Sequence, residues 1–346
     1  MSAWELIFAG FKTLNEYILQ HTLFCLIPAF FIAGAISAFL NQESVMRYFG
    51  PQAKKPVAYG VASVSGAILA VCSCTVLPIF MGIYKKGAGL GPAIAFLYSS
   101  PAINILAMAY SVHLLGYDLG IARIVAAVTL ASFIGLIMAA IFRKEESERA
   151  AGAFAYGTDP PRPTYQTLLY FGVMIAILVY GTARIPSIAK YLGEAVLVAV
   201  LVFLITRWFK KEEIKEWMSE TWRMTRMLVP VLLLGVFLVG IIIEVLPPEW
   251  IVRFVGGNSV KSNAIASVSG ALMYFATLTE VPIVKGLLDL GMGKGPALAL
   301  LLAGPALSLP SMLVLIRILG FKKAFTYILL VCVSAMGVGL LFGAIF

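Results

Sequence analysis

The sequence predicts an all-α polytopic membrane protein, with about ten apolar segments in two internal repeats and broken helices near the membrane midplane. Of its 346 residues, 61% are hydrophobic and only 12% are charged, whereas a soluble domain typically has about 25% charged residues. Apolar runs of about 18 residues or more, the length that marks a membrane span, cover most of the chain. The third observation is a stretch that recurs at a constant offset of 204 residues.

The apolar segments and the polar stretches between them divide the chain into five parts. The segments lie near residues 14–40, 57–83, 91–112, 119–142, 165–184, 191–209, 227–246, 260–288, 295–316 and 323–345. They give a first membrane repeat (1–142), a polar Pro-rich linker (143–163), two connecting segments (164–210), an interfacial amphipathic stretch (211–226) and a second repeat (227–346). The Lys/Arg excess in the charged connections 143–163 and 207–226 predicts that both are cytoplasmic, if the two segments between them span.

The charge balance and the scarcity of reactive side chains exclude several function classes. The net charge of +9 fits Lys and Arg in short loops against anionic lipid, so we expect lipid and a small-molecule solute as partners, and no nucleic acid. All four cysteines lie in apolar stretches, which argues against a disulfide-stapled exterior. Two histidines are too few for bis-His haem ligation, and no ATPase phosphate loop is present. The sequence therefore predicts a multi-pass protein of the cell membrane that is not an enzyme and has no cofactor or metal.

The stretch that starts at Ala62 recurs without a gap at Ala266. The two copies share glycines and prolines, which serve particular backbone geometries and are not expected to recur through membrane composition alone. The matched pairs are Gly66/Gly270, Pro78/Pro282, Gly82/Gly286, Gly91/Gly295, Pro92/Pro296 and Pro101/Pro305. Many secondary transporters are built by such duplication. The repeats are parallel if all ten segments span, and inverted if one middle segment is re-entrant.

Prolines predict breaks inside the apolar segments. The run 57–83 would be roughly 40 Å long as one helix, against a hydrocarbon core of about 30 Å. Pro78 also removes a backbone donor and crowds the carbonyl of Cys74. We expect interruptions near Cys74–Pro78, Ser99–Pro101, Thr279–Pro282 and Gly304–Pro310. Because non-helical backbone at membrane depth is tolerated only where it is buried or lines a cavity, these breaks predict one central site.

Cys72 and Cys74 stand one residue apart at the first predicted break. On a helix they would point about 200° apart, but in an unwound segment they project to the same side, with Cα atoms about 7 Å apart. Two thiols could then hold one soft, thiophilic atom. The second repeat has Ala276 and Leu278 at these positions, so the expected site is asymmetric. The remaining cysteines, Cys25 and Cys332, are expected to be structural.

Glu280 is the polar counterpart in the second repeat, at the position where the first repeat has Val76. An acidic residue inside a membrane is costly and marks a candidate proton relay or cation ligand. We expect Glu280 to couple a proton; the alternatives are that it lies nearer the surface or that it pairs with Lys285. Further polar contacts to the solute are expected from Thr75, Ser99, Ser100, Asn104, Thr279 and Ser308.

The stretch CSCTVLPIFMGIYKKGAGLGPAIAFLYSSPAINI resembles the predicted-permease family that includes ArsP, the organoarsenical efflux permeases. The likeness covers both repeats and is strongest from Ser65 to Asn104. It implies a transporter, and ArsP members export trivalent organoarsenicals with the help of cysteines. At matching positions this role falls on Cys72 and Cys74. The family is broader than arsenic, and a sulfur compound or another soft solute would suit the same thiols.

Two other classes of function stay open. The first is a membrane thiol-disulfide oxidoreductase in which Cys72 and Cys74 cycle between dithiol and disulfide, although that disulfide ring is strained and the usual redox spacing is Cys-x-x-Cys. The second is a passive channel. The sequence favours a permease that moves a small soft or sulfur-containing solute without ATP hydrolysis of its own.

Overall fold

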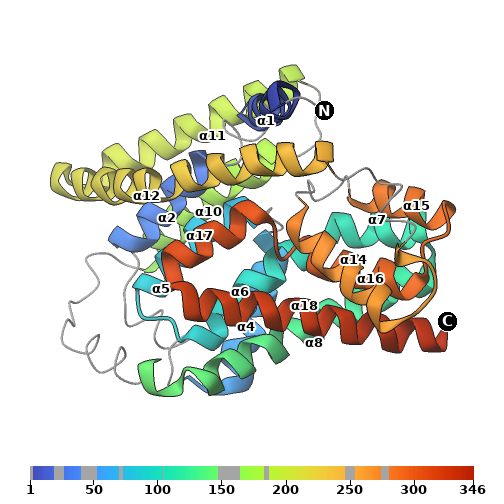
Figure 1. Ribbon diagram of the computed structural model, residues 1–346. Coiled ribbons are helices and arrows are strands. Elements are labelled where there is room, and N and C mark those ends of the chain that lie inside the picture. The colour runs from blue at the N-terminus through green and yellow to red at the C-terminus, as the bar shows by residue number, and fades with distance from the viewer. Residues whose placement is uncertain are drawn as a thin grey trace.

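The computed structural model describes residues 3–18, 27–39, 53–69, 73–103, 105–146, 164–182, 187–245, 254–273 and 280–346. This part of the chain forms helices and no β-strand (Figure 1). The prediction of an all-α protein is therefore confirmed for the described residues.

Five helices form one group, drawn in the upper part of Figure 1. They are α1 (Ala3–Tyr17), α2 (Ile27–Phe39), α10 (Thr164–Thr182), α11 (Ser187–Trp208) and α12 (Lys211–Val245). Helix α12 packs against α1 and α2, and the Trp217 indole N–H donates to the Phe31 carbonyl at 2.9 Å. Helix α12 passes through Pro230 without a break, so the charged stretch 211–226 and the apolar segment that follows it belong to one helix.

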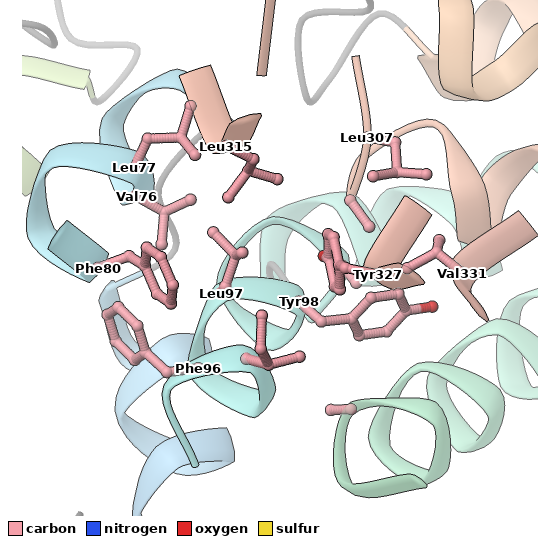
Figure 2. Close-up of a cluster of buried hydrophobic side chains, with 14 of the residues drawn as sticks. Val76, Leu77, Phe80, Phe96, Leu97, Tyr98, Leu307, Leu315, Tyr327 and Val331 are labelled. Carbon is pink, nitrogen blue, oxygen red and sulfur yellow. The ribbon is translucent and has the colours of Figure 1, made fainter. Parts of the chain in front are cut away.

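Ten helices make up the second group. They are α4 (Lys55–Leu69), α5 (Ser73–Lys85), α6 (Leu90–Ala102), α7 (Ile105–Leu115), α8 (Tyr117–Ile141), α14 (Val260–Leu272), α15 (Glu280–Asp289), α16 (Lys294–Ala303), α17 (Leu309–Leu319) and α18 (Phe321–Ile345). Helix α6 packs against α4 and α8, and α16 packs against α14 and α18. Every residue of α6 and nearly all of α16 are buried, so these two helices form the centre of the core, part of which is shown in Figure 2.

Glycines allow the central helices to cross closely. A Cβ atom on Gly135 of α8 would lie 2.6 Å from the carbonyl oxygen of Gly91 in α6. A Cβ atom on Gly339 of α18 would lie 2.7 Å from the carbonyl oxygen of Gly295 in α16. Lipid tails are as apolar as side chains, so helices in a membrane associate largely through such close backbone packing.

Four described helical stretches are long and apolar enough to cross a membrane: Tyr117–Ile141, Tyr191–Trp208, Lys211–Leu238 and Phe321–Ile345. Large apolar side chains are exposed along them, including Val125, Phe203 and Leu329, as expected for helices that face lipid. Shorter apolar stretches of 10–17 residues are Ile27–Phe39, Thr75–Lys85, Leu169–Gly181, Lys294–Ala303 and Leu309–Leu319, and each has fewer than the approximately 20 residues that one span requires. The number of ten spans stays a prediction.

The helix ends differ from the predicted breaks in the first repeat. The interruption predicted at Cys74–Pro78 was wrong in position, because α5 is helical from Ser73 to Lys85 with Pro78 inside it. Helix α6 likewise continues through Ser99–Pro101 and ends at Ala102. A proline removes one helical hydrogen bond; Pro101 lies next to the end of α6, whereas Pro78 is the sixth residue of α5. Burial of the surrounding side chains offsets that loss.

In the second repeat, helix ends also lie close to the prolines. Helix α14 ends at Leu272 and α15 begins at Glu280, with Pro282 in its first turn. Residues 304–308 separate α16 from α17, in the stretch where the sequence predicts an interruption.

Polar side chains gather at one end of the second group, where α8 ends. The Glu146 carboxylate accepts hydrogen bonds from the Tyr84 hydroxyl at 2.9 Å and from the Lys323 ammonium at 3.1 Å. Its other oxygen accepts from the backbone N–H of Leu90, the first residue of α6, at 3.1 Å. Glu146 thus joins the end of α8 to the end of α5 and to the starts of α6 and α18. We call this the Glu146 end.

The charged start of α12 contributes to the same end. Burial lowers the pKa of Lys86, and Glu216 and Glu220 of α12 partly oppose that shift. At the opposite end, Lys294 Nζ lies 3.8 Å from Asp118 Oδ2, and both side chains are exposed. We call this the Asp118 end. Residues from both charged connections therefore meet at one end, as expected if the two connections lie on one side of a membrane.

Candidate transport site

The predicted serines of α6 are buried, but their hydroxyls already have backbone partners. Ser100 Oγ donates to the Phe96 carbonyl at 2.9 Å. Ser99 Oγ lies 3.2 Å from the same carbonyl and 3.4 Å from that of Ala62. Thr75 is fully buried in α5. The two serine hydroxyls thus satisfy helix carbonyls within the core.

Ser308 begins a helix. Its side chain accepts a hydrogen bond from the Ser311 N–H at 3.3 Å, and Pro310 occupies the first turn of α17. This is an N-cap with proline in the first turn, an arrangement that satisfies an otherwise unpaired backbone donor.

Several predicted residues cannot be placed. Cys72, Asn104 and Thr279 lie outside the described residues. Cys74 is the second residue of α5, but the position of its side chain lies outside the described part. The structure therefore describes the start of the helix that carries Cys74 and does not test the thiol pair.

Glu280 forms a buried ion pair with Arg123, which was not singled out in the sequence. The Arg123 guanidinium donates from Nη2 to Glu280 Oε1 and from Nη1 to Ser111 Oγ, the latter at 2.7 Å. The exposed fractions of the two charged side chains are 0% and 1%. Lys285 pairs instead with the exposed Asp289 at 2.6 Å. The alternative in which Glu280 pairs with Lys285 was therefore wrong, because the carboxylate faces the interior.

The ion pair joins elements that are far apart in the chain. Arg123 lies on α8, Ser111 on α7 and Glu280 on α15, and the pair spans 157 residues of sequence. Isolated charges are very costly in such surroundings, so buried charges pair and accept further hydrogen bonds. Here that satisfaction is incomplete. Glu280 Oε2 and Arg123 Nε have no hydrogen-bond partner among the described residues.

Two tyrosines lie near this pair. The Tyr98 hydroxyl donates to the Leu302 carbonyl at 3.3 Å, and Tyr98 lies close enough to Arg123 for the guanidinium to favour its ionised form. Figure 2 shows Tyr98 and Tyr327 beside one another in the buried core. The Tyr327 hydroxyl is fully buried and has no hydrogen-bond partner in the described part of the chain.

Arg123 could have been found from the sequence, because it is the charged residue inside the apolar segment 119–142. A charge within a membrane segment is by default a functional candidate. Its partner could not have been found in this way, since no local pattern connects residues that far apart.

Comparison with known proteins identifies the family. The chain matches the family described as "Predicted permease" from residue 7 to residue 344, and it belongs to that family. This confirms the resemblance seen in the sequence, and the family is one of membrane transport proteins. No solved structure matches the chain.

Two relatives are similar over most of the chain. The UPF0718 protein MJ0584 of Methanocaldococcus jannaschii is 45% identical over 346 residues, which cover 96% of this chain and 95% of the relative. The UPF0718 protein YraQ of Escherichia coli is 24% identical over 272 residues, which cover 78% of this chain and 63% of the relative.

Proposed function

We propose that the chain is a multi-pass secondary transporter of the cell membrane that moves a small soft, thiophilic or sulfur-containing solute and couples this movement to a proton. Trivalent organoarsenicals, moved outward, are one candidate. The solute would contact Cys72 and Cys74, with Thr75, Ser99, Ser100, Asn104, Thr279 and Ser308 around them, and Glu280 would carry the proton.

The helix boundaries support a duplicated architecture. Helices α7 and α17 begin and end at positions that differ by the repeat offset, and so do α8 and α18. The two glycine crossings, at Gly91/Gly135 and Gly295/Gly339, obey the same offset. Glycines with positive φ also recur at this spacing, with 96° at Gly87 and 104° at Gly291. A left-handed backbone favours glycine, so the same turn geometry explains why both positions carry glycine.

The polar ends support an inverted arrangement of the repeats. Lys323, in the first turn of α18, bonds to Glu146 just beyond the end of α8, so these matching helices run in opposite directions. The Lys294–Asp118 pair brings the starts of α16 and α8 together. At the Glu146 end, the starts of the matching helices α6 and α18 are brought together by their shared bonds to Glu146. Inverted repeats are a common basis of alternating access in secondary transporters.

The observation that carries the proposal is the fully buried Arg123–Glu280 pair between the two repeats. Removing one member of a buried pair costs about 3–5 kcal/mol, while replacing both by apolar groups is often neutral or stabilising. Stability alone is therefore a weak reason for such a pair. A proton on Glu280 would break it, which gives a transporter two states with different affinities for solute.

The helix start at Ser73 supports a reactive thiol pair. Cys74 lies in the first turn of α5, and Cys72 directly precedes that helix in the sequence. The first turn of a helix presents unpaired N–H groups and partial positive charge. Both favour the thiolate, which is the form that binds soft atoms.

A thermal-shift screen of the purified protein against arsenicals, sulfur oxyanions, thiols and persulfides tests the thiol site. We expect at least one class to raise the unfolding temperature, and the Cys72→Ser/Cys74→Ser variant to lose that shift. Cys332→Ser is the matched control and should respond like the unchanged protein. The proposal fails if no class stabilises the protein, or if the double variant responds and transports fully.

A further inference from the structure

The Arg123–Glu280 pair has no charged counterpart in the other half of the molecule. At the repeat offset, Arg123 corresponds to Tyr327, Ser111 to Leu315 and Glu280 to Val76. These three counterparts are buried in the apolar cluster of Figure 2, together with Phe80. One of two equivalent positions is therefore charged and hydrogen-bonded, and the other is packed with apolar side chains.

The charged position lies toward the Asp118 end. Arg123 follows the exposed Asp118 by five residues in α8, which is about 7.5 Å along the helix axis. Tyr98 and Leu302 occupy matching positions in the two repeats and contact each other. The pseudo-symmetry axis that relates the repeats therefore passes near this contact. Tyr327 and Val76, which match Arg123 and Glu280, consequently lie on the other side of this axis, toward the Glu146 end.

The guanidinium is set up to hold an oxyanion. Its two Nη groups donate to a carboxylate oxygen and to Ser111 Oγ, and its Nε has no partner in the described chain. A guanidinium binds carboxylates and other oxyanions through two parallel N–H donors. Here one oxygen of the carboxylate, Glu280 Oε2, has no partner among the described residues. The carboxylate therefore fills the anion position of Arg123 with incomplete contacts.

We propose that Arg123 is the anion-binding residue of the transport site, and that a small oxyanion replaces the Glu280 carboxylate on it while Glu280 takes up a proton. The anion accepts the N–H groups of Arg123, and the displaced carboxylate forms an O–H bond with a proton from water. A singly charged anion brings one negative charge and the proton brings one positive charge, so the net charge of the buried site is then unchanged; with a doubly charged anion such as thiosulfate the site gains one negative charge. This assignment rests on the proposed transport function and gives the solute an anionic oxygen as well as a soft atom, as in thiosulfate.

The other titratable side chains on the helices that pack against α15 are exposed, so Arg123 is the charged partner of Glu280 among the described residues. Helix α15 packs against α7 and α16, which carry Tyr110, His113 and Lys294. All three of these side chains are exposed. Within the described residues, Arg123 is the charged group that acts on Glu280, so a proton arriving there changes one defined ion pair.

Anion binding to the full chain in detergent tests the proposal without requiring transport. Thermal unfolding is followed against thiosulfate, inorganic phosphate and chloride at constant ionic strength and several pH values. We expect thiosulfate or phosphate to bind the unchanged protein more tightly as the pH falls. Glu280→Gln should bind it about tenfold more tightly or better, with no pH dependence. Asp289→Asn, which removes an exposed acid from the same helix, should behave like the unchanged protein.

Arg123→Gln/Glu280→Gln should abolish oxyanion binding. The proposal is overturned if this double variant binds as Glu280→Gln does, or if Glu280→Gln binds no better than the unchanged protein. Should the variants fail to fold, proton uptake decides: the unchanged protein in weak buffer should take up about one proton per bound anion, and binding without uptake overturns the proposal. The thiol experiment can fail independently, because these variants retain both cysteines.

Discussion

Tyr98 and Leu302 contact each other at the centre of the molecule, and they are separated in the sequence by the repeat offset of 204 residues. When matching residues touch, they lie near the axis that relates the two repeats. The helices that carry them, α6 and α16, are also the most completely buried. In the proposed duplicated architecture, the two repeats therefore meet at the centre of the core.

The hydroxyls of Tyr98 and Tyr327 should make different contributions to stability. Tyr98 donates a hydrogen bond at 3.3 Å, whereas Tyr327 is buried with no partner in the described part. Tyr98→Phe should lower the free energy of unfolding by about 1 kcal/mol, and Tyr327→Phe should be neutral or stabilising. Denaturation of the purified variants in detergent measures both. A larger loss for Tyr327→Phe would show that its hydroxyl has a partner.

Close packing of α16 and α18 predicts a strong difference between two glycines of α18. A Cβ at Gly339 would lie 2.5 Å from Asn263 Oδ1 and 2.7 Å from the Gly295 carbonyl, while a Cβ at Gly337 meets nothing within 4 Å. Gly339→Ala should therefore cost about 1–3 kcal/mol through overpacking. Gly337→Ala should be neutral or slightly stabilising. Equal unfolding temperatures for the two variants would contradict the helix crossing.

The Glu146 end gives a second matched comparison. Glu146 is 9% exposed and bonds to Lys323, Tyr84 and the first N–H of α6, whereas its neighbour Glu145 is 57% exposed and lies 3.2 Å from Lys323. We expect Glu146→Ala to lower the unfolding free energy by about 2 kcal/mol, and Glu145→Ala to change it by less than about 1 kcal/mol. The same loss in both variants would mean that Glu146 does not join these helices.

The buried ion pair should be strongly coupled in a double-mutant cycle. Arg123→Gln and Glu280→Gln should each destabilise the protein by about 3–5 kcal/mol, because each leaves one charge unpaired in the core. The double variant should recover part of that loss, which gives a coupling energy of about 0.5–3 kcal/mol. Additive losses, measured by denaturation in detergent, would show that the two side chains do not interact.

The sequence predicts the repeat from glycine and proline matches, since such residues are required by local backbone geometry at helix crossings and turns. The bounds of α7 and α17, and those of α8 and α18, differ by the same offset, which is consistent with this prediction. Pro78 lies well inside α5, whereas α6 ends one residue after Pro101, so of these two predicted interruptions only the one near Ser99–Pro101 lies at a helix end. The cap at Ser308 was readable in the sequence as serine two residues before proline, although we expected a solute contact there.

The candidate site was predicted only in part. Glu280 stood out because a carboxylate in an apolar segment is costly, and its burial agrees with that reasoning. Arg123 was visible as a charge in an apolar segment, but its pairing with Glu280 was out of reach, because the contact depends on how α8 packs relative to α15. No periodicity or spacing specifies such a contact between side chains 157 residues apart.

The most direct test of the coupling claim is proton movement driven by solute in sealed proteoliposomes with a pH-sensitive dye inside. The solute is the one that stabilises the purified protein most, and the imposed gradient is of solute alone. We predict that the unchanged protein and Asp289→Asn change the internal pH as solute moves, whereas Glu280→Gln moves solute without changing it. An equal pH change with Glu280→Gln, or solute movement without any pH change in the unchanged protein, would contradict the account.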